Sequence, residues 1–493
     1  MLLSSFSDKL PVYTIEQVRE LDRIAIQEQG IPGYELMQRA ANALFAAIME
    51  HYPQAHSVCI VCGAGNNAGD GYVLARLARE AGWMVLVLAV STPNQLQSDA
   101  HTAYQDYLVA GGQVEAFTGE LPCADLLVDA LFGTGLTRPL QAEFAIAVEA
   151  MNAYPKPVIA VDIPSGLNGN TGQPLGVAVK AALTVTFIGL KQGLLTGQAR
   201  DYVGDLVLAD LALPSTVLQQ VPAHTSTLST RLLTQRLPKR ARCAHKGKFG
   251  HVLLIGGQAG MAGAIRLAGE AALRTGSGLV TLGTDPTHAA WLNLTRPELM
   301  VAALQPSDLD ELLMGKTVVG LGPGLGKTAL AQVIWANTLK TDVPLVLDAD
   351  ALNLLAQAPQ LRSNWILTPH PAEAARLLGC STQEIEQDRF TAIHALQQKY
   401  GGVIVLKGAG SLIANEQQVA ICLAGNPGMS TAGMGDVLTG IITSLVGQGL
   451  NLWEAACVGV LLHALAGDEA AKQGERGMLA SDLINSLRSW VNP

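Results

Sequence analysis

A glycine-rich turn with a single acid, between Asn426 and Gly440, has the residue types that phosphoryl transfer requires. The turn leads into an apolar run, Val437–Val446, that is compatible with a helix. Backbone N–H groups at the start of a helix favour a bound phosphate. Asp436 stands at this point, where its carboxylate can accept a proton from a substrate hydroxyl. The alternative is that Asp436 only caps the helix, which would be the preferred interpretation if the turn stood alone.

Three acids in the first half of the chain accompany apolar runs that are typical of strands. Asp129 and Asp162 come at the ends of two such runs, and Asp70 lies in the glycine-rich stretch that follows another. Parallel strands bind their ligands at their carboxyl ends, so we expect the three acids to converge. One acid in such a place is often structural, but three together indicate a site.

The stretch Gly63–Gly71 contains Gly-x-Gly-x-x-Ala, a pattern close to the dinucleotide-binding fingerprint. In that fingerprint the next strand ends in an acid that binds the ribose, whereas the run Met84–Val90 is followed by Ser-Thr. This weakens the interpretation as an ordinary nicotinamide-cofactor site. The side-chain oxygens of Asn66, Asn67 and Asp70 suit a hard cation or a polyhydroxylated ligand instead. That the asparagines only supply turn conformations is the weaker alternative.

The second half repeats the pattern of glycine-rich turns after apolar runs. Gly320–Thr328 looks like a phosphate-binding loop, but the position five before Gly326 is Leu321, so the G-x4-G-K-[ST] spacing fails. Two acids close the run that ends at Asp350. His370 lies between two prolines after a further apolar run, which holds the imidazole more rigidly than a loop histidine usually is.

Apolar runs alternate with helix-compatible stretches in both halves, which predicts α/β domains with parallel sheets. Between Pro214 and Lys248 this alternation stops, and Pro, Ser, Thr and Gln dominate. We therefore predict a domain boundary here, with a solvated basic run at its end. Cys59 and Cys62 form a C-x-x-C inside an apparent strand. An offset of three along a strand puts the two thiols on opposite faces, so neither a zinc site nor a redox site is expected.

Composition narrows the class of protein. The chain has 493 residues, enough for two or three domains. A hydrophobic fraction of 49% with 5% aromatic residues and 51 glycines suits tightly turned α/β layers. The formal net charge of −9 offers no basic field for nucleic acid or an anionic membrane. No apolar run reaches ~18 residues, and the N-terminus lacks the order of a signal peptide, so we expect a soluble cytoplasmic protein.

The ordered motifs of both halves resemble those of one family, the bacterial bifunctional NAD(P)H-hydrate repair enzymes. The second half is similar to the ribokinase-like superfamily and to its NAD(P)H-hydrate dehydratase branch, through Gly322–Gly326, Thr368–Glu373, Lys407–Ser411, Asn426–Gly428 and Gly433–Asp436. The first half resembles NAD(P)H-hydrate epimerase, through Gly30–Gly33, Asn66–Gly71, Asp129–Gly135 and Asp162–Gly166. The resemblance covers nearly the whole chain except the linker.

The resemblance implies an α/β protein of two three-layer αβα domains. These are a Rossmann-like epimerase domain over residues 1–215, a linker over 216–244 and a ribokinase-like dehydratase domain over 245–493. The first domain would interconvert the R and S hydrates of NADH and NADPH (NADHX and NADPHX). The second would dehydrate the S hydrate with ADP, giving AMP and phosphate, because phosphorylation turns the ring hydroxyl into a good leaving group.

The resemblance also implies the ligands: potassium in the epimerase site, and magnesium with ADP as cosubstrate in the dehydratase site. No nucleic-acid or membrane partner is implied. The apolar helices and glycine-rich domains suggest a homo-oligomer. Both nucleotides, ADP and ATP, and both hydrates stay open as substrates.

Site residues are carried over by the resemblance position by position. The expected catalytic residues are Asp162 and Asp436, and the expected potassium ligands are Asn67, Asp129 and Ser165. The expected contacts to the hydrate in the first half are Asn66, Asn67, Ala68, Gly69, Asp70, Gly133, Thr134, Gly135, Leu136, Thr137, Arg138, Pro139 and Asp162. In the second half they are Ala264, Gly322, Gly324, His370 and Asp436. The expected nucleotide contacts are Lys407, Gly408, Ala409, Gly410, Ser411 and Gly435.

The chain departs from the family pattern at four positions. Ala68 and Ala372 stand where glycine is usual, Met434 replaces a small residue and Ser411 replaces threonine. We expect activity to survive all four, with an altered hydrate affinity from Ala68. Two alternative functions were weighed: a small-molecule kinase of the vitamin type, and a first half that is only a non-catalytic binding module. A kinase leaves the first half unexplained, and the three strand-end acids weigh against a mere binding module.

Overall fold

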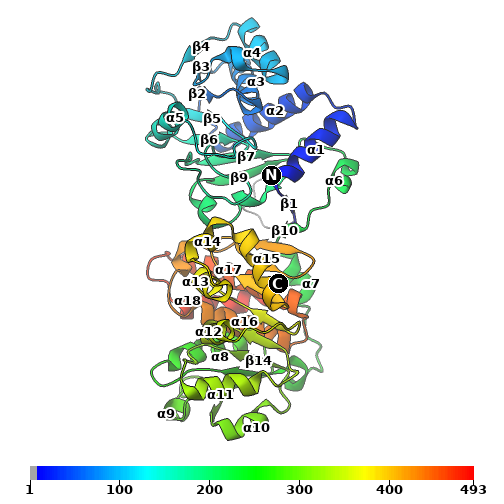
Figure 1. Ribbon diagram of the computed structural model, residues 1–493, viewed down its shortest axis with the longest axis vertical. Helices are drawn as coiled ribbons and strands as arrows, with labels where there is room; N and C mark the ends of the chain where they lie inside the picture. Colours follow the sequence, from blue (N-terminus) through cyan, green and yellow to red (C-terminus); the bar gives the residue numbers. More distant parts are fainter. Residues whose placement is uncertain (1–7) are drawn as a thin grey trace. The chain divides into compact units, whose positions relative to one another are not determined.

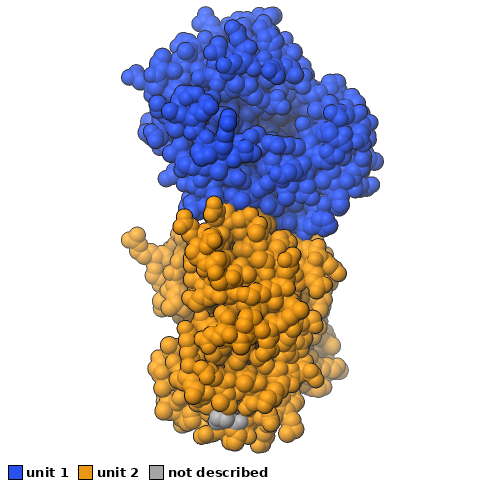
Figure 2. All heavy atoms as spheres, in the orientation of Figure 1, with its two compact units in different colours: residues 1–5, 10–225 blue, residues 6–9, 226–493 orange. Residues whose placement is uncertain are grey.

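The computed structural model describes residues 8–493, which divide into two compact units. Of the described residues, unit 1 contains 10–225 and unit 2 contains 8–9 and 226–493 (Figures 1 and 2). The division falls inside the segment 216–244, for which the sequence predicts a linker. This segment is structured, because it holds α7 (Arg231–Arg236) and most of α6 (Ser215–Gln220), which begins one residue before it. Each helix anchors itself with one apolar side chain, Val217 in α6 and Leu233 in α7, both buried.

Unit 1 is built on a parallel sheet of seven strands in the order β4-β3-β2-β5-β6-β7-β9. The strands are β2 (Ser57–Cys62), β3 (Met84–Ala89), β4 (Val114–Ala116), β5 (Leu126–Ala130), β6 (Val158–Val161), β7 (Leu183–Phe187) and β9 (Asp205–Ala209). Their continuous apolar sequences are typical of strands buried on both faces. The strand order reverses between β2 and β5, and such a switch point opens a crevice at the carboxyl ends of the strands.

Helices cover both faces of this sheet (Figure 1). One core joins the sheet to α2 (Gly33–His51), α3 (Asn66–Glu80) and α4 (Ser98–Val109), and the other joins it to α5 (Ala142–Asn152). Cys62 belongs to the first core and Cys59 to the second. The prediction that these two thiols lie on opposite faces of the sheet is therefore confirmed.

From the sequence alone, the stretch Thr184–Lys191 predicts one strand with Lys191 as a candidate cation at its end, and the single strand is wrong. β7 ends at Phe187, and Lys191 belongs to a separate two-residue strand, β8 (Leu190–Lys191). The break lies at Ile188, whose φ is 67°, and the Gly189 N–H donates to the Phe187 carbonyl at 2.7 Å across it. β8 then pairs with β1 (Pro11–Tyr13) rather than continuing the main sheet.

Unit 2 contains a second sheet, in the order β13-β12-β11-β14-β15-β16-β17-β18-β19. It is parallel from β13 to β17, and β18 and β19 follow as an antiparallel hairpin. The strands are β11 (His251–Ile255), β12 (Leu279–Thr284), β13 (Met300–Ala303), β14 (Val318–Leu321), β15 (Leu345–Leu347), β16 (Trp365–Leu367), β17 (Val403–Leu406), β18 (Ser411–Ala414) and β19 (Val419–Cys422). The strand order reverses between β11 and β14, which again creates a switch point.

One face of the unit 2 sheet packs on four helices that share a single core: α8 (Ala262–Thr275), α16 (Met434–Gly447), α17 (Leu452–Ala471) and α18 (Ala480–Trp490). Strand residues that point the other way, such as Leu253, Val319 and Leu347, are equally buried. The connections after β14 supply α11 (Ala329–Thr338), α12 (Ala349–Gln357), α13 (Pro371–Leu378) and α15 (Arg389–Tyr400). Among the described helices, none has the length and apolar character that crossing a membrane demands.

Candidate active sites

The carboxyl ends of the unit 1 strands border a cavity of about 150 Å³. Its walls come from α1 (Ile15–Gln27), α2, α3 and the turns after β6 and β7, so segments far apart in the sequence meet there. The charged residues that line it are four acids and two bases: Asp22, Asp70, Asp99, Asp162, Arg19 and Lys191. Asp129, in contrast, is 0% exposed beneath the surface of the unit. Of the three acids that the sequence expects to converge, two therefore face the cavity and one is buried.

Asp162 stands in a strained turn at the end of β6. Its φ is 69°, and the Ile163 N–H donates to the Val161 carbonyl at 2.8 Å, which makes Asp162 the centre of a γ-turn with positive φ. Such strain persists only where the surroundings fix it, and it clusters at functional sites. Here the Phe187 N–H (3.1 Å) and the Thr186 hydroxyl (3.2 Å) donate to Oδ1 of Asp162.

Lys191 completes the set of donors on Asp162. Its ammonium nitrogen lies 2.5 Å from Oδ1 of Asp162, and it also donates to Thr186 Oγ1 (2.9 Å) and the Phe187 carbonyl (2.7 Å). The lysine is 1% exposed. The buried lysine therefore has three oxygen partners, and the ion pair holds the Asp162 side chain in place. The break in the strand at Ile188 is what turns Lys191 back onto Asp162.

Asp70 has a different environment in the same cavity. It lies on the first turns of α3 and is 9% exposed. Within residues 8–493, no hydrogen-bond donor contacts its carboxyl. Burial raises the pKa of Asp70 well above its usual range, the charges of Asp162 and Asp22 raise it further, and Lys191 opposes them. The pKa of Asp22 is also raised, by burial and by the charges of Asp162 and Asp99.

The two stretches predicted to hold the hydrate in unit 1 meet at Gly133. A methyl group at Gly133 would lie 3.0 Å from Asn67 Oδ1 and 3.3 Å from Asp162 Oδ2. The residue has to be small for these two side chains to approach the turn. Asn66 and Thr134 line the cavity, and the exposed positions 135 and 137–139 extend the turn away from it.

Ala68 does not face the cavity. It is 0% exposed and belongs to the core that α3 forms with the sheet. The neighbouring Gly69 is equally internal, because a methyl group there would lie 2.9 Å from the backbone of Ala100. The methyl group of Ala68 therefore packs into this core, and any effect of the departure on hydrate affinity would have to act through the packing of α3.

The oxygen atoms around Ser165 have the chemistry that a hard monovalent cation needs. Asp129 Oδ1 accepts a hydrogen bond from Ser165 Oγ at 2.6 Å, and Oδ2 accepts one from the Ser165 N–H at 2.7 Å. The Phe132 carbonyl lies 3.2 Å from Ser165 Oγ. Burial raises the pKa of Asp129 to about 6, while the bonds from Ser165 lower it. The buried Nδ2 of Asn67 has no partner in the described chain and, as a donor, suits an oxygen atom of the substrate, whereas the Asn67 oxygen Oδ1 is the atom that could coordinate a cation. The residues present fit a potassium ion.

In unit 2, Asp436 lies inside the first turn of α16. The helix follows Gly433, whose φ of 92° suits glycine, and Asp436 is its third residue. Asp436 therefore does not occupy the cap position, and the alternative in which it only caps the helix is wrong. Burial raises the pKa of Asp436 to about 7, the charge of Asp348 raises it, and Lys407 lowers it. A carboxylate with a pKa near neutrality is well matched to general-base catalysis.

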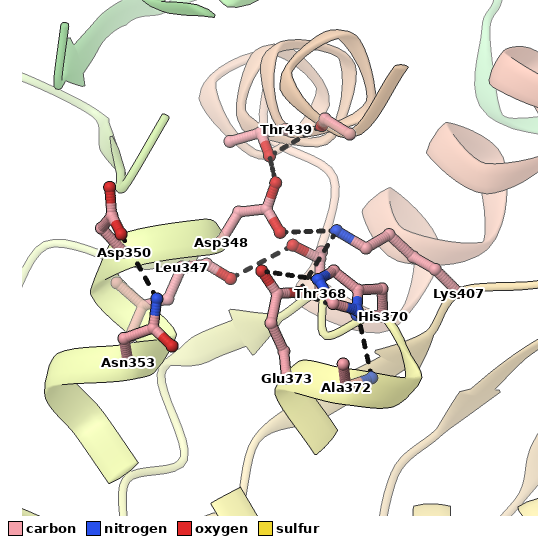
Figure 3. Close-up of polar contacts among 11 residues, drawn as sticks. Leu347, Asp348, Asp350, Asn353, Thr368, His370, Ala372, Glu373, Lys407 and Thr439 are labelled. Carbon is pink, nitrogen blue, oxygen red and sulfur yellow. Dashed lines mark hydrogen bonds and ion pairs between the residues drawn. The ribbon is translucent and has the colours of Figure 1, made fainter. Parts of the chain in front are cut away.

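A network of charged residues lies at the ends of three parallel strands (Figure 3), and its members Asp348, Lys407 and Glu373 act on the pKa of Asp436. Lys407 Nζ donates to Asp348 Oδ1 at 2.7 Å, and Thr439 Oγ1 donates to Asp348 Oδ2 at 2.9 Å. Glu373 Oε2 lies 3.7 Å from Lys407 Nζ. Burial alone would lower the pKa of Lys407, but the two carboxylates outweigh it and the pKa is raised. Lys407 therefore stays charged, and this network links α16 to the ends of β15, β16 and β17.

His370 caps α13. Its ring nitrogen Nδ1 accepts a hydrogen bond from the Ala372 N–H at 3.1 Å, and the backbone N–H of His370 donates to Glu373 Oε2 at 2.8 Å. Burial lowers the pKa of His370, and Lys407 lowers it further, so the imidazole is neutral at pH 7. Because Nδ1 is used by the cap, Nε2 carries the proton of the neutral ring, and it lies 3.5 Å from Glu373 Oε1. The Ala372 departure keeps the N–H that the cap requires.

The predicted nucleotide contacts form the turn between β17 and β18. Ser411 Oγ donates to the Gly408 carbonyl at 2.9 Å, so serine performs the bonding that threonine would. A methyl group at Gly408 would lie 2.9 Å from the guanidinium of Arg389, which donates to the carbonyls of Leu406 and Lys407. The backbone of this turn is exposed at positions 408 and 409, where a nucleotide can reach it.

The glycines of Gly322–Gly326 bring the remaining predicted residues to the same edge of the sheet. A methyl group at Gly322 would lie 1.8 Å from the Asp348 carbonyl, and one at Gly324 would lie 3.3 Å from the side chain of Ala264. A methyl group at Gly435 would lie 3.3 Å from Lys407 Nζ. The unit 2 residues expected to bind hydrate and nucleotide therefore share one site.

The sequence left four of the residues in these sites without a role. Asp348 and Glu373 stand within motifs that it identified, and Lys191 was noted only as a cation at a strand end. Asp22 gave no local signal, because it lies in an ordinary amphipathic helix whose partners are more than forty residues away. Only the pattern of strand-end acids could have pointed toward Asp348.

Two family models match the chain. One is described as NAD(P)H-hydrate dehydratase and matches residues 252–489, and the other is described as the N-terminus of YjeF-related proteins and matches residues 33–193. Each match falls within one of the two units.

Full-length relatives are similar over almost the whole chain. A bifunctional NAD(P)H-hydrate repair enzyme of Coxiella burnetii is 48% identical over 98% of this chain and 99% of its own length. One of Escherichia coli is 45% identical over 98% of this chain and 94% of its own length. Among solved structures, an ADP/ATP-dependent NAD(P)H-hydrate dehydratase of Bacillus subtilis, co-crystallised with ATP and Mg²⁺, is 28% identical with a TM-score of 0.50. The match covers 54% of this chain and 96% of that one.

Proposed function

The chain belongs to the family of bifunctional NAD(P)H-hydrate repair enzymes, and we propose that the cavity of unit 1 is the epimerase site and the charged network of unit 2 the dehydratase site. The protein epimerises the R and S hydrates of NADH and NADPH and dehydrates the S hydrate. The residues named above in each site are the ones that we assign to these two reactions.

In unit 2 the S hydrate lies against Ala264, Gly324 and His370, and the nucleotide lies on the turn Lys407–Ser411. Asp436 takes the proton of the ring hydroxyl as that oxygen attacks the terminal phosphoryl group of ADP. The backbone N–H groups at the start of α16 stabilise charge on the transferred group. The phosphorylated oxygen then leaves as phosphate while the adjacent ring carbon loses a proton to solvent, which restores the ring double bond, and AMP is released.

Magnesium supplies electrostatic stabilisation of the phosphate oxygens when it is bound with the nucleotide. Residues 8–493 contain no group of three or more His, Cys, Asp or Glu arranged to hold a metal ion. The ion would therefore be held mainly by the nucleotide phosphates, as magnesium commonly is. The role of the chain is to orient the phosphates through the Lys407–Ser411 turn.

In unit 1 the hydrated ring lies in the cavity, with Asp162 against the carbon that changes configuration. A potassium ion held by Asn67, Asp129 and Ser165 would supply a fixed positive charge that binds and orients the hydrate. Gly133 lets the turn approach both Asn67 and Asp162, which couples this ion to the catalytic carboxylate.

The observation that carries the dehydratase assignment is the position of Asp436, which is the third residue of a helix that begins after a glycine and lies under the charge of the half-buried Lys407. The direct test mixes the purified protein with chemically hydrated NADH and ADP and follows the return of the reduced-nicotinamide absorbance. We expect one AMP and one phosphate for each NADH recovered. If nucleotide turnover instead required an alcohol such as a pyrimidine or a pyridoxal, and left it phosphorylated, the protein would be a kinase.

A further inference from the structure

We propose that Asp70 is the proton donor of the epimerase site and Asp162 the opposing base, so that inversion exchanges the ring hydroxyl for a solvent oxygen. This assignment rests on the proposed epimerase function of unit 1. It divides between two acids a task for which the sequence suggested one. The observations behind it are the unequal surroundings of these two carboxyls in one cavity.

The Asp162 carboxyl is held in place by three donors. Lys191, Thr186 and the Phe187 backbone all donate to Oδ1, and within residues 8–493 the Lys191 ammonium forms no other ion pair. Oδ2 accepts none of these bonds and faces the turn at Gly133, 3.3 Å from where a methyl group there would lie. One oxygen of Asp162 is therefore fixed, and the other is left for the substrate.

The Asp70 carboxyl has no such support. No donor contacts it in the described chain, and the charged groups that face the cavity with it are three further acids and two bases. The acids are Asp22 on α1, Asp99 on α4 and Asp162 at the end of β6; the bases are Lys191, already bonded to Asp162, and Arg19 on α1. Burial and neighbouring carboxyls both favour the protonated form of an acid, and no donor among residues 8–493 offsets them at Asp70. The raised pKa of Asp70, caused first by burial, agrees with this.

The size of the cavity matches a ring rather than a whole dinucleotide. Its volume is about 150 Å³, and an engineered protein cavity of about 150 Å³ binds one benzene molecule. The hydrated nicotinamide ring is of this size. A ring seated here has Asp70 and Asp162 within one enclosed space, which is what an acid and a base need in order to act on the same carbon.

The chemistry follows from the substrate. The carbon that carries the hydroxyl is bonded to the ring nitrogen, whose lone pair can expel a leaving group. Asp70 gives its proton to the hydroxyl, the carbon–oxygen bond breaks and water leaves, while the nitrogen pair forms a carbon–nitrogen double bond. The cation is planar at that carbon, and the Asp162 carboxylate stabilises it.

Inversion is completed from the opposite face. Asp162 removes a proton from a second water as its oxygen bonds to the planar carbon, and the electron pair of the double bond returns to nitrogen. Asp70 has then lost one proton and Asp162 has gained one, and exchange with solvent restores both. Two carboxyls with separated affinities for a proton are the arrangement that inverting hydrolases use at sugar carbons.

The first experiment follows the oxygen atom. Full-length protein without ADP is mixed with the pure R hydrate of NADH in water enriched in oxygen-18, and the S hydrate is analysed by mass spectrometry against a sample without enzyme. We expect each molecule of S hydrate to carry one solvent oxygen. Inversion with the original oxygen retained would point to ring opening and closure, and would overturn the proposal.

The second experiment tests Asp70 itself. Asp70→Asn should slow epimerisation by about 10²–10⁴-fold and abolish the fall in rate that the wild type shows at high pH, where Asp70 loses its proton. Asp70→Glu should recover part of the rate and the high-pH fall. The exposed Glu115 on β4 provides the matched control, since Glu115→Gln also removes one carboxylate from unit 1.

The dehydratase activity of unit 2 provides a control that distinguishes a loss of folding from a loss of epimerase activity. ADP-dependent dehydration of pure S hydrate and the melting temperature report whether the Asp70 variants are folded. If Asp70→Asn is folded and epimerises at wild-type rate while Asp162→Asn is inactive, the assignment of Asp70 is wrong and the epimerase function stands. If the wild type itself does not interconvert the hydrates, the proposed function of unit 1 is wrong.

Discussion

The ammonium nitrogen of Lys407 lies 2.7 Å from Oδ1 of Asp348, although 58 residues separate them in the chain. Asp348 Oδ2 is bonded in turn to Thr439, one turn beyond Asp436 on α16. Asp348 therefore joins the turn that we assign to nucleotide binding with the helix that carries the base. The lysine that the sequence assigns to the nucleotide has its ammonium group engaged by the protein, so the backbone of the turn is the surface left for phosphate.

Removing the charge of Asp348 should move the pH dependence of dehydration. Asp436 acts as a base only when ionised, so the rate falls as the pH drops through its pKa of about 7. The negative charge of Asp348 raises that pKa. Asp348→Asn should therefore shift the acid limb of the pH–rate profile, where the dehydration rate falls, to lower pH by about one unit. Initial rates with S hydrate and ADP, measured from about pH 5 to about pH 9, give the size of this shift.

Thr439→Val is the matched control for this shift. It removes the hydrogen bond to Asp348 but leaves every charge in the network. We expect its acid limb to stay with the wild type, even if kcat falls. A limb that moves equally in both variants would mean that geometry, rather than charge, sets the pKa of Asp436.

Asp436→Asn should abolish the chemical step and spare the rest. The amide keeps the shape of the carboxyl but cannot take a proton, so dehydration should slow by at least about 10²–10⁴-fold. ADP affinity, measured by calorimetry, should change little because the Lys407–Ser411 turn is intact. Epimerisation by unit 1 provides the internal control. If Asp436→Asn dehydrated the S hydrate at a near wild-type rate, Asp436 would not be the base of this reaction.

The same substitution should stabilise the protein at neutral pH. The pKa of Asp436 is about 7 in the folded protein against an ordinary 3.8. The folded state therefore binds the proton more tightly than the unfolded chain, and the wild type loses stability as the pH rises from about 4 to 7. Asp436→Asn cannot lose that proton, so its melting temperature should exceed that of the wild type at pH 8. At pH 4 the two should melt together.

Asp162 and Lys191 allow stability and catalysis to be separated. Asp162→Asn should slow R-to-S interconversion strongly and should also lower the melting temperature, because it leaves Lys191 charged, buried and without its carboxylate. The double variant Asp162→Asn with Lys191→Met removes the stranded charge. We expect it to regain much of the stability and none of the epimerase activity. Recovery of activity in the double variant would show that Asp162 only neutralises Lys191.

The cation site predicts a crystallographic signal. Asn67, Asp129 and Ser165 supply oxygen atoms suited to a monovalent ion, so a crystal soaked in thallium or rubidium should show an anomalous peak among them. Ser165→Ala removes one of these oxygens and should weaken the peak. Absence of a peak in the wild type would contradict the potassium assignment.

The sequence by itself determined the fold class and the chemical character of both sites. Alternating apolar runs and helices specify a parallel α/β sheet, and such a sheet binds its ligand at the carboxyl ends of its strands. Asp436 could be placed from its turn alone, because a glycine-rich loop before an apolar run is a local feature. The same local logic placed Asp70 and Asp162 at one edge of the unit 1 sheet.

Only the tertiary structure decided which groups act on one another. Asp22 enters the epimerase cavity from a helix that carries no motif, and Lys191 reaches Asp162 because the chain turns at Ile188 where the sequence suggested a continuous strand. A pKa depends on burial and on neighbouring charge, and both arise only when distant segments are packed together. The sequence could therefore name the acids, whereas the packing of these segments determines which acid keeps its proton.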